Sequence, residues 1–441
     1  MESEKRVSVQ TLIKYFAYAA IAVEAVFAAF WLFKNIGVLQ SDYVAHTYIL
    51  AADSLVVDDS MGILYALIVR VLGHGAVLQI VQVGIGTLAV LFFATSLLDK
   101  SAAVVLTGFV ALNPIVLQAE TAVAPGALVL ACVLIAIGSV VRSKGNTKWY
   151  AGLFVSALLA GFLNPDYAYL FAVGGFVCFI CKCVVRKRFE VVLFVFVAIS
   201  VIVPVFVNRA IGDDRAYGRV HRSAEYLVMQ RLAWSRMTEY GELAQAWLEY
   251  YAGGPDAEYN LWLADADKVP EDLSLEFANR FEEAVGVENA RDYYKTVSQY
   301  AWGKGLGYWA HDWVRDELLY LAAPASAAYA YLAKMTDTSV VNGLNFMFRE
   351  SPTIFKVYFL FASAALVVLI VLYICKCFIK PDGGRRVIGL PVAVSILVII
   401  VLLSLYASLI CVREFDYRNV LFMVVGWPAA VMALTERRDT V

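Results

Sequence analysis

Apolar blocks recur along the chain, and several are as long as the roughly 20 residues that a helix needs to cross a bilayer. Hydrophobic residues make up 61% of the 441 positions, and the mean hydropathy of +0.69 exceeds that of soluble globular proteins. These features predict an all-α, polytopic membrane protein. The formal net charge of −2 gives no reason to expect a nucleic-acid partner.

Ten segments are apolar enough to be predicted as transmembrane helices. They cover residues 12–36, 76–98, 101–118, 126–142, 149–163, 168–184, 191–209, 353–375, 387–412 and 420–435. The chain then divides into an N-terminal transmembrane core (1–211), a polar helical insertion (212–350) and C-terminal transmembrane helices (351–441). Glu24 lies within the first span, and we expect it to face the bundle interior as a structural polar contact.

The distribution of basic residues predicts which loops are cytoplasmic. Lys100, Arg142 and Lys148 fall in one set of loops, and that set alternates with loops that are acidic or neutral. Because basic loops stay on the cytoplasmic side, both termini are expected there. Segment 41–60 and the insertion 212–350 are then extracytoplasmic, in a multi-pass protein of the plasma membrane.

Segment 41–60 is predicted to be an amphipathic helix on the membrane surface. Its apolar side consists of Val44, Tyr48, Ala51 and Leu55. Its opposite side consists of Asp42, His46 and Asp53. The residues Asp58, Asp59 and Ser60 offer N-caps for a second short helix over 61–72.

Three acids are the main catalytic candidates. Asp42 follows the first span closely and is placed to act as a general base, with Asp53 as the alternative base and His46 beside them. A cap of the surface helix would equally explain Asp42. Glu120, at the outer end of the third span, is expected to bind the acceptor or assist proton transfer, although a helix-end residue reaching water would look the same.

External arginines are the candidates for binding phosphate. Arg413 and Arg418 lie in the last external loop, and guanidinium groups bind phosphate in bidentate fashion. Pairing with the neighbouring Glu414 and Asp416 is the structural alternative. Two further guanidinium groups could add to the same site. They belong to Arg219 and Arg222, at the start of the insertion.

Four features together resemble the GT-C superfamily of membrane glycosyltransferases, which includes the protein O-mannosyltransferases and the aminoarabinose lipid A transferases. They are Asp42 opening an external helix, the run Leu64-Tyr65-x-x-Ile68, the external Glu120, and Asp416-Tyr417-Arg418 before a span containing Pro428. The chain departs from the family where Asp42-Tyr43 replaces the common Asp-Glu pair and where Asn419 follows Arg418.

This resemblance implies transfer of a sugar from a polyprenyl-phosphate donor to a glycan, lipid or protein acceptor, with inversion at the anomeric carbon. It implies that Asp42 takes the acceptor's proton while Arg418 and Arg413 stabilise the leaving lipid phosphate. A divalent metal, Mg²⁺ or Mn²⁺, is possible between Asp42 and Glu120 as a weak oxygen-ligand site. The alternatives are a lipid or glycolipid transporter or flippase, and a catalytically silent scaffold of the same fold.

Overall fold

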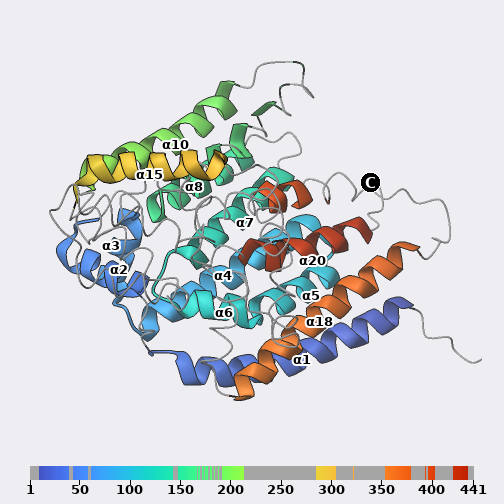
Figure 1. The fold of residues 1–441 in the computed structure, drawn as a ribbon. Coiled ribbons are helices and arrows are strands. Elements are labelled where there is room, and N and C mark those ends of the chain that lie inside the picture. The colour runs from blue at the N-terminus through green and yellow to red at the C-terminus, as the bar shows by residue number, and fades with distance from the viewer. Residues whose placement is uncertain are drawn as a thin grey trace, which may run out of the picture.

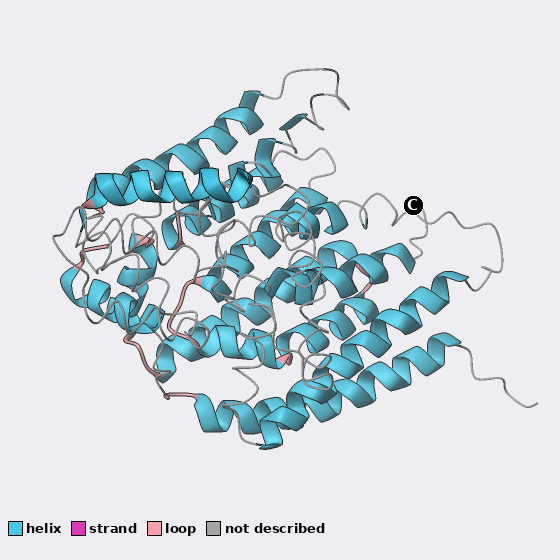
Figure 2. Cartoon of the chain, viewed as in Figure 1, coloured by secondary structure: helices cyan, strands magenta, loops and turns pink. Residues whose placement is uncertain are grey.

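The computed structural model describes residues 9–38, 43–57, 61–142, 148–165, 191–212, 285–303, 353–378 and 421–435. It also describes Leu321 and pieces of 167–187 and 393–402. Within these residues all regular secondary structure is helical (Figure 2). The helices are α1 (Val9–Asn35), α2 (Tyr43–Ser54), α3 (Ile63–Leu72), α4 (Ala76–Leu97), α5 (Lys100–Ala111), α6 (Pro114–Thr121), α7 (Gly126–Arg142), α8 (Lys148–Leu163), α10 (Val191–Ile211), α15 (Val287–Gly303), α18 (Thr353–Phe378) and α20 (Leu421–Thr435).

Four helices are long and apolar enough to cross a membrane, namely α1, α4, α10 and α18. A fifth crossing results if α5 and α6 count as one bent span. The apolar helices α3, α7, α8 and α20 are shorter. An all-helical, multi-pass membrane protein is thereby confirmed, while the number of ten spans stays a prediction.

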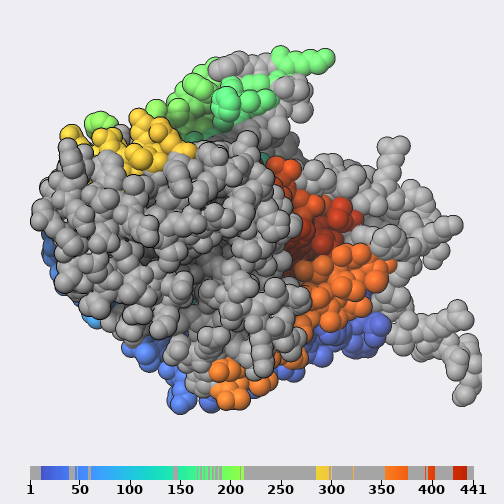
Figure 3. Space-filling model, viewed as in Figure 1, coloured from blue at the N-terminus to red at the C-terminus, as the bar shows by residue number. Residues whose placement is uncertain are grey.

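Helices that are distant in sequence form the bundle shown in Figure 1. α18 lies along α1 (Figures 1 and 3). The rings of Phe27 and Tyr358 stack between them with their centroids 5.5 Å apart. On the other side, α4, α7, α8 and α10 pack in succession. Small residues allow these close approaches, since Gly138 of α7 faces Phe92 of α4 and Gly152 of α8 faces Ser139 of α7.

The third predicted span, 101–118, is not one straight helix, which corrects the sequence-based expectation. α5 and α6 meet at an angle of 62°. Asn113 caps α6 through a hydrogen bond that its Oδ1 accepts from the Ile115 amide at 3.0 Å. Pro114 then occupies the first helical position and has no N–H with which to continue α5. The break leaves the Leu112 carbonyl to accept a hydrogen bond from the Tyr358 hydroxyl of α18.

Tyr358→Phe is expected to destabilise the bundle by about 1–3 kcal/mol, because the Leu112 carbonyl loses this donor in apolar surroundings. Thermal unfolding of the purified protein in detergent measures the effect. Tyr15→Phe is the matched control, since Tyr15 is 70% exposed on α1. Equal midpoints for the two variants would contradict the role assigned to Tyr358.

The surface helix is shorter than predicted. α2 ends at Ser54, and Leu55 adopts a positive φ of 56° at the helix end, where its side chain is 38% exposed. Leu55 therefore lies outside the helix and not on its apolar side, and Tyr48 and Ala51 are buried in the protein core, whereas the prediction placed them on the membrane. α3 begins after Gly62, which holds the N-cap position, and residues 58–60 lie outside the described part.

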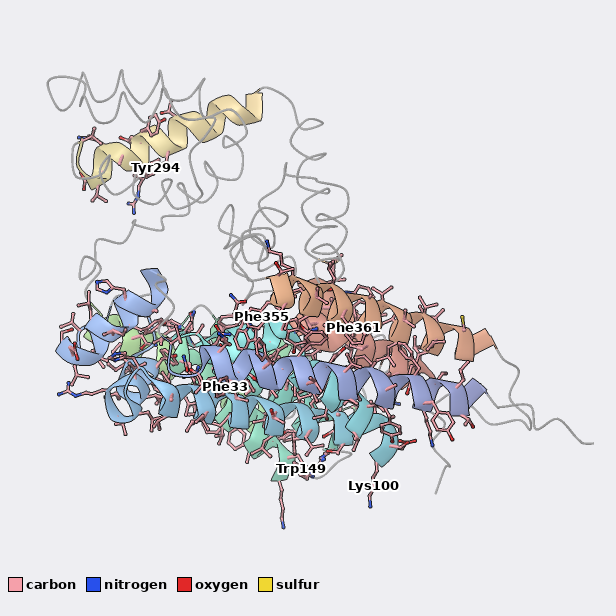
Figure 4. All side chains as sticks on the ribbon, turned by 90° about the horizontal axis from the view of Figure 1, so that it is seen from below. Phe33, Lys100, Trp149, Tyr294, Phe355 and Phe361 are labelled. Carbon is pink, nitrogen blue, oxygen red and sulfur yellow. The ribbon has the colours of Figure 1, made fainter. Side chains whose placement is uncertain are left out.

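Basic residues gather at the end of the bundle opposite α2 and α3. The Arg142 guanidinium donates hydrogen bonds to Ser96 Oγ at 2.8 Å and Thr95 Oγ1 at 2.9 Å. It also lies over the rings of Phe92 and Trp149, at 4.3 and 5.6 Å from their centroids. We call this arrangement the Arg142 clamp. α5 and α8 start at this same end with Lys100 and Lys148, and Figure 4 labels Lys100 and Trp149 there.

The insertion contributes one described helix, α15, in agreement with its prediction as helical. Figure 4 shows α15 set apart from the bundle. It follows Gly286, whose φ of +84° suits glycine at a sharp change of direction.

Candidate buried acid site

Three of the predicted site residues lie in the described part of the chain: Glu120, His46 and Asp53. The other predicted site residues lie outside it, namely Asp42, Arg413, Arg418, Arg219 and Arg222. The geometry of the site is therefore built around Glu120.

Glu120 is the penultimate residue of α6, and only 2% of its surface is exposed. It fits against α4 because residue 86 is glycine: a Cβ added there would overlap Glu120 Oε1 and lie 2.8 Å from its Cδ. Glu120 Oε2 has no hydrogen-bond partner among the described residues. Glu120 is therefore not a helix-end residue reaching water but an enclosed acid with an unused oxygen.

Gln82 of α4 anchors the backbone on both sides of this acid. Its Nε2 donates to the carbonyls of Glu120 at 2.7 Å and Ala122 at 2.9 Å. Its Oε1 accepts from the hydroxyl of Tyr65 in α3 at 2.8 Å. Gln82 thus donates hydrogen bonds to carbonyls at the C-terminal end of α6. No further helical turn follows there to supply backbone donors.

Gln79, one turn earlier on α4, links the same region to the segment after α1. Its Nε2 donates to the Thr121 carbonyl at 2.8 Å and the Val38 carbonyl at 3.2 Å, and its Oε1 accepts from the Gly37 amide at 2.6 Å. Neither glutamine was predicted as part of the site. Two buried amides three residues apart in an apolar span were the signal that could have identified them.

α2 is joined to this network through aromatic packing. The rings of Tyr48 and Tyr65 meet edge to face with their centroids 4.8 Å apart. On the other side of α2, His46 and Asp53 are exposed, as predicted. The structure therefore brings α2 and Glu120 to the same end of the bundle, but it presents His46 and Asp53 outward and encloses Glu120.

Glu24 faces the bundle interior as predicted, with 1% of its surface exposed. The polar contact expected for it is not made within the described part, where both carboxylate oxygens lack a hydrogen-bond partner. No group of three or more His, Cys, Asp or Glu side chains in that part could hold a metal ion. The hypothesis of a metal between Asp42 and Glu120 remains a prediction, since Asp42 lies outside the described residues.

Comparisons with protein-family models, with curated proteins and with solved structures found no match to this chain.

Proposed function

We propose that the chain is an integral membrane glycosyltransferase of the GT-C type, using a polyprenyl-phosphate sugar as donor. The observation that carries the proposal is the enclosed Glu120 at the end of a broken span, beside the two short helices α2 and α3. The family resemblance implies this order of elements. Two short helices follow the first span, and an acid lies between the third and fourth spans. An ionisable side chain enclosed among apolar helices points to function by default.

In the proposed reaction the acceptor's hydroxyl or amine attacks the anomeric carbon of the donor sugar. Asp42 accepts the proton, the bond to the lipid phosphate breaks, and the anomeric centre inverts. Arg418 and Arg413 stabilise the phosphate that leaves, and Arg219 and Arg222 extend that positive region. Glu120 orients the acceptor through its unused oxygen.

The proposed orientation places the α2–α3 end of the bundle outside the cell. Lys100, Arg142 and Lys148 lie at the opposite end, in keeping with cytoplasmic basic loops. In this arrangement the chain crosses the plasma membrane ten times with both termini cytoplasmic, and loop 212–350 is extracytoplasmic. The partners are then the lipid donor, membrane lipids and a glycan, lipid or protein acceptor.

The proposal is tested by reconstituting the purified full chain in lipid vesicles with a panel of polyprenyl-phosphate sugars that are labelled in the sugar. Release of free polyprenyl phosphate and appearance of the label on an acceptor are the expected results. Intact donor after incubation with every sugar and with acceptors of all three classes would overturn it.

Gly86→Ala is expected to lower the transfer rate by about 100-fold, because the new methyl group displaces the Glu120 carboxylate from its place against α4. Gly84→Ala is the matched control: it lies on the same helix, and an added Cβ there meets nothing within 4 Å. Transfer assays on both variants, normalised to folded protein, measure the difference. Equal rates would show that the position of Glu120 does not matter for transfer.

A lipid or glycolipid transporter is the second candidate, and the 62° bend between α5 and α6 favours it. Transporters build their substrate sites from discontinuous helices of this kind. The same vesicles separate the two functions. A transporter moves the labelled lipid between leaflets and leaves its sugar–phosphate bond intact.

A further inference from the structure

Glu24 has no part in the proposed transfer reaction, yet it is the one acid of α1 and is almost fully buried. Its two carboxylate oxygens have no hydrogen-bond partner within the described residues, and it lies inside an apolar span. A carboxylate that is removed from water without donors or a counter-charge costs several kcal/mol or more. Among the described residues, no side chain or backbone group neutralises this carboxyl by a hydrogen bond.

The register of α1 against its neighbours places Glu24 at the break in the third span. Ile21 of α1 packs against Gly108 of α5, and further along α1, Ala28 and Trp31 cluster with Leu117 of α6. These residues and Glu24 recur at the spacing of one helix face. Glu24 therefore lies between the α5 contact and the α6 contact, level with residues 112–113.

Tyr358 of α18 lies at the same break. Its hydroxyl donates to the Leu112 carbonyl at the break, its ring stacks on Phe27, and it lies within electrostatic reach of the Glu24 carboxyl. Breaks in membrane helices expose backbone carbonyls that attract protons and cations. Glu24 and the Leu112 carbonyl are thus both neighbours of Tyr358, near the α5–α6 break.

Charged groups on the helices packed against α1 lie elsewhere. α5 carries only Lys100, at its first residue, and α6 carries only Glu120, near its last. On α18, Lys356 precedes Tyr358 by two residues and so lies on the opposite side of that helix, and Lys376 lies near its C-terminal end. Lys14 and Lys34 lie toward the two ends of α1. Tyr358 is therefore the titratable group of the described part that faces Glu24.

We propose that Glu24 is a proton-binding site at the α5–α6 break. The bound proton neutralises the carboxyl and allows α1 to pack against α18 and the break. Loss of that proton leaves a carboxylate with no hydrogen-bond donor between α1 and α18, and this weakens the packing of the two helices. This inference does not depend on the transferase proposal.

The test compares the full-length chain with Glu24→Gln, which keeps the shape of the side chain without a titratable group. Glu288→Gln is the matched control, since Glu288 is exposed on α15. Thermal unfolding midpoints are measured for all three proteins between about pH 5 and about pH 9. The folded state holds a proton that the unfolded state releases, so stability falls as pH rises.

We expect the wild-type midpoint to fall with rising pH relative to that of Glu24→Gln, and Glu288→Gln to follow the wild type. Parallel curves for wild type and Glu24→Gln would overturn the proposal. So would a difference between them that depends on sodium concentration and not on pH, because a metal cation would then be the occupant.

A second measurement uses the infrared band of protonated carboxylic acids in protein carrying isotopically labelled glutamate. Glu120→Gln serves as the background and removes the other buried glutamate of the described residues. The expected result is a glutamic-acid band at neutral pH that disappears at alkaline pH. A spectrum that shows the carboxylate band and no carboxylic-acid band at neutral pH would overturn the proposal. This measurement does not depend on whether Glu24→Gln folds.

Discussion

Gly62→Ala is expected to be among the most damaging single substitutions in the bundle, costing roughly 3 kcal/mol or more. A Cβ at this position would overlap the backbone carbonyls of Phe162 and Leu163 at the end of α8. These are backbone atoms, so no side-chain rotation relieves the overlap. The same junction is fixed by Asn208 of α10, which accepts from the Ile63 amide at 3.4 Å and donates to the Gly161 carbonyl at 3.1 Å.

Thermal unfolding in detergent measures this loss, and Gly84→Ala is again the control. At Gly84 the added methyl group meets open space and replaces a poor helix former, so this variant is expected to be at least as stable as the wild type. A Gly62→Ala protein as stable as Gly84→Ala would mean that α3 does not pack this closely on the end of α8.

Asp42→Asn is expected to lower sugar transfer by about 1,000-fold while leaving the protein folded and inserted. Asparagine preserves the shape of the side chain and its capacity to cap a helix, but it cannot take a proton from the acceptor. Transfer of labelled sugar in reconstituted vesicles gives the rate, and the thermal unfolding midpoint reports on folding.

Asp53→Asn tests which of the two acids assigned to the surface helix, Asp42 or Asp53, is the base. Asp53 is exposed on α2, and its replacement is expected to change the rate little if Asp42 is the base. Wild-type rates for Asp42→Asn together with a large loss for Asp53→Asn would transfer the role of base to Asp53.

Hydrophobic runs allowed much of the helical layout to be predicted. The segments 76–98 and 126–142 agree with α4 and α7 to within one residue. The break at Asn113 was missed, because an apolar pattern averages over a single polar residue and a proline. An Asn-Pro pair inside an apolar run was the local signal for a new helix start.

Of the buried site, the acid alone was predicted from the sequence. Glu120 stood out because carboxylates are rare inside spans, but its burial against Gly86 depends on how α4 packs on α6. The same is true of Gln82 and Tyr65, whose partners lie on other helices. Such long-range contacts leave no periodic trace in the sequence.

The Arg142 clamp also restrains the separation of α4, α7 and α8. It joins α7 to Thr95 and Ser96 of α4 and to the Trp149 ring of α8 at one end of the bundle. We therefore expect any separation of α4, α7 and α8 to be smallest at the Arg142 end and larger toward the Glu120 end.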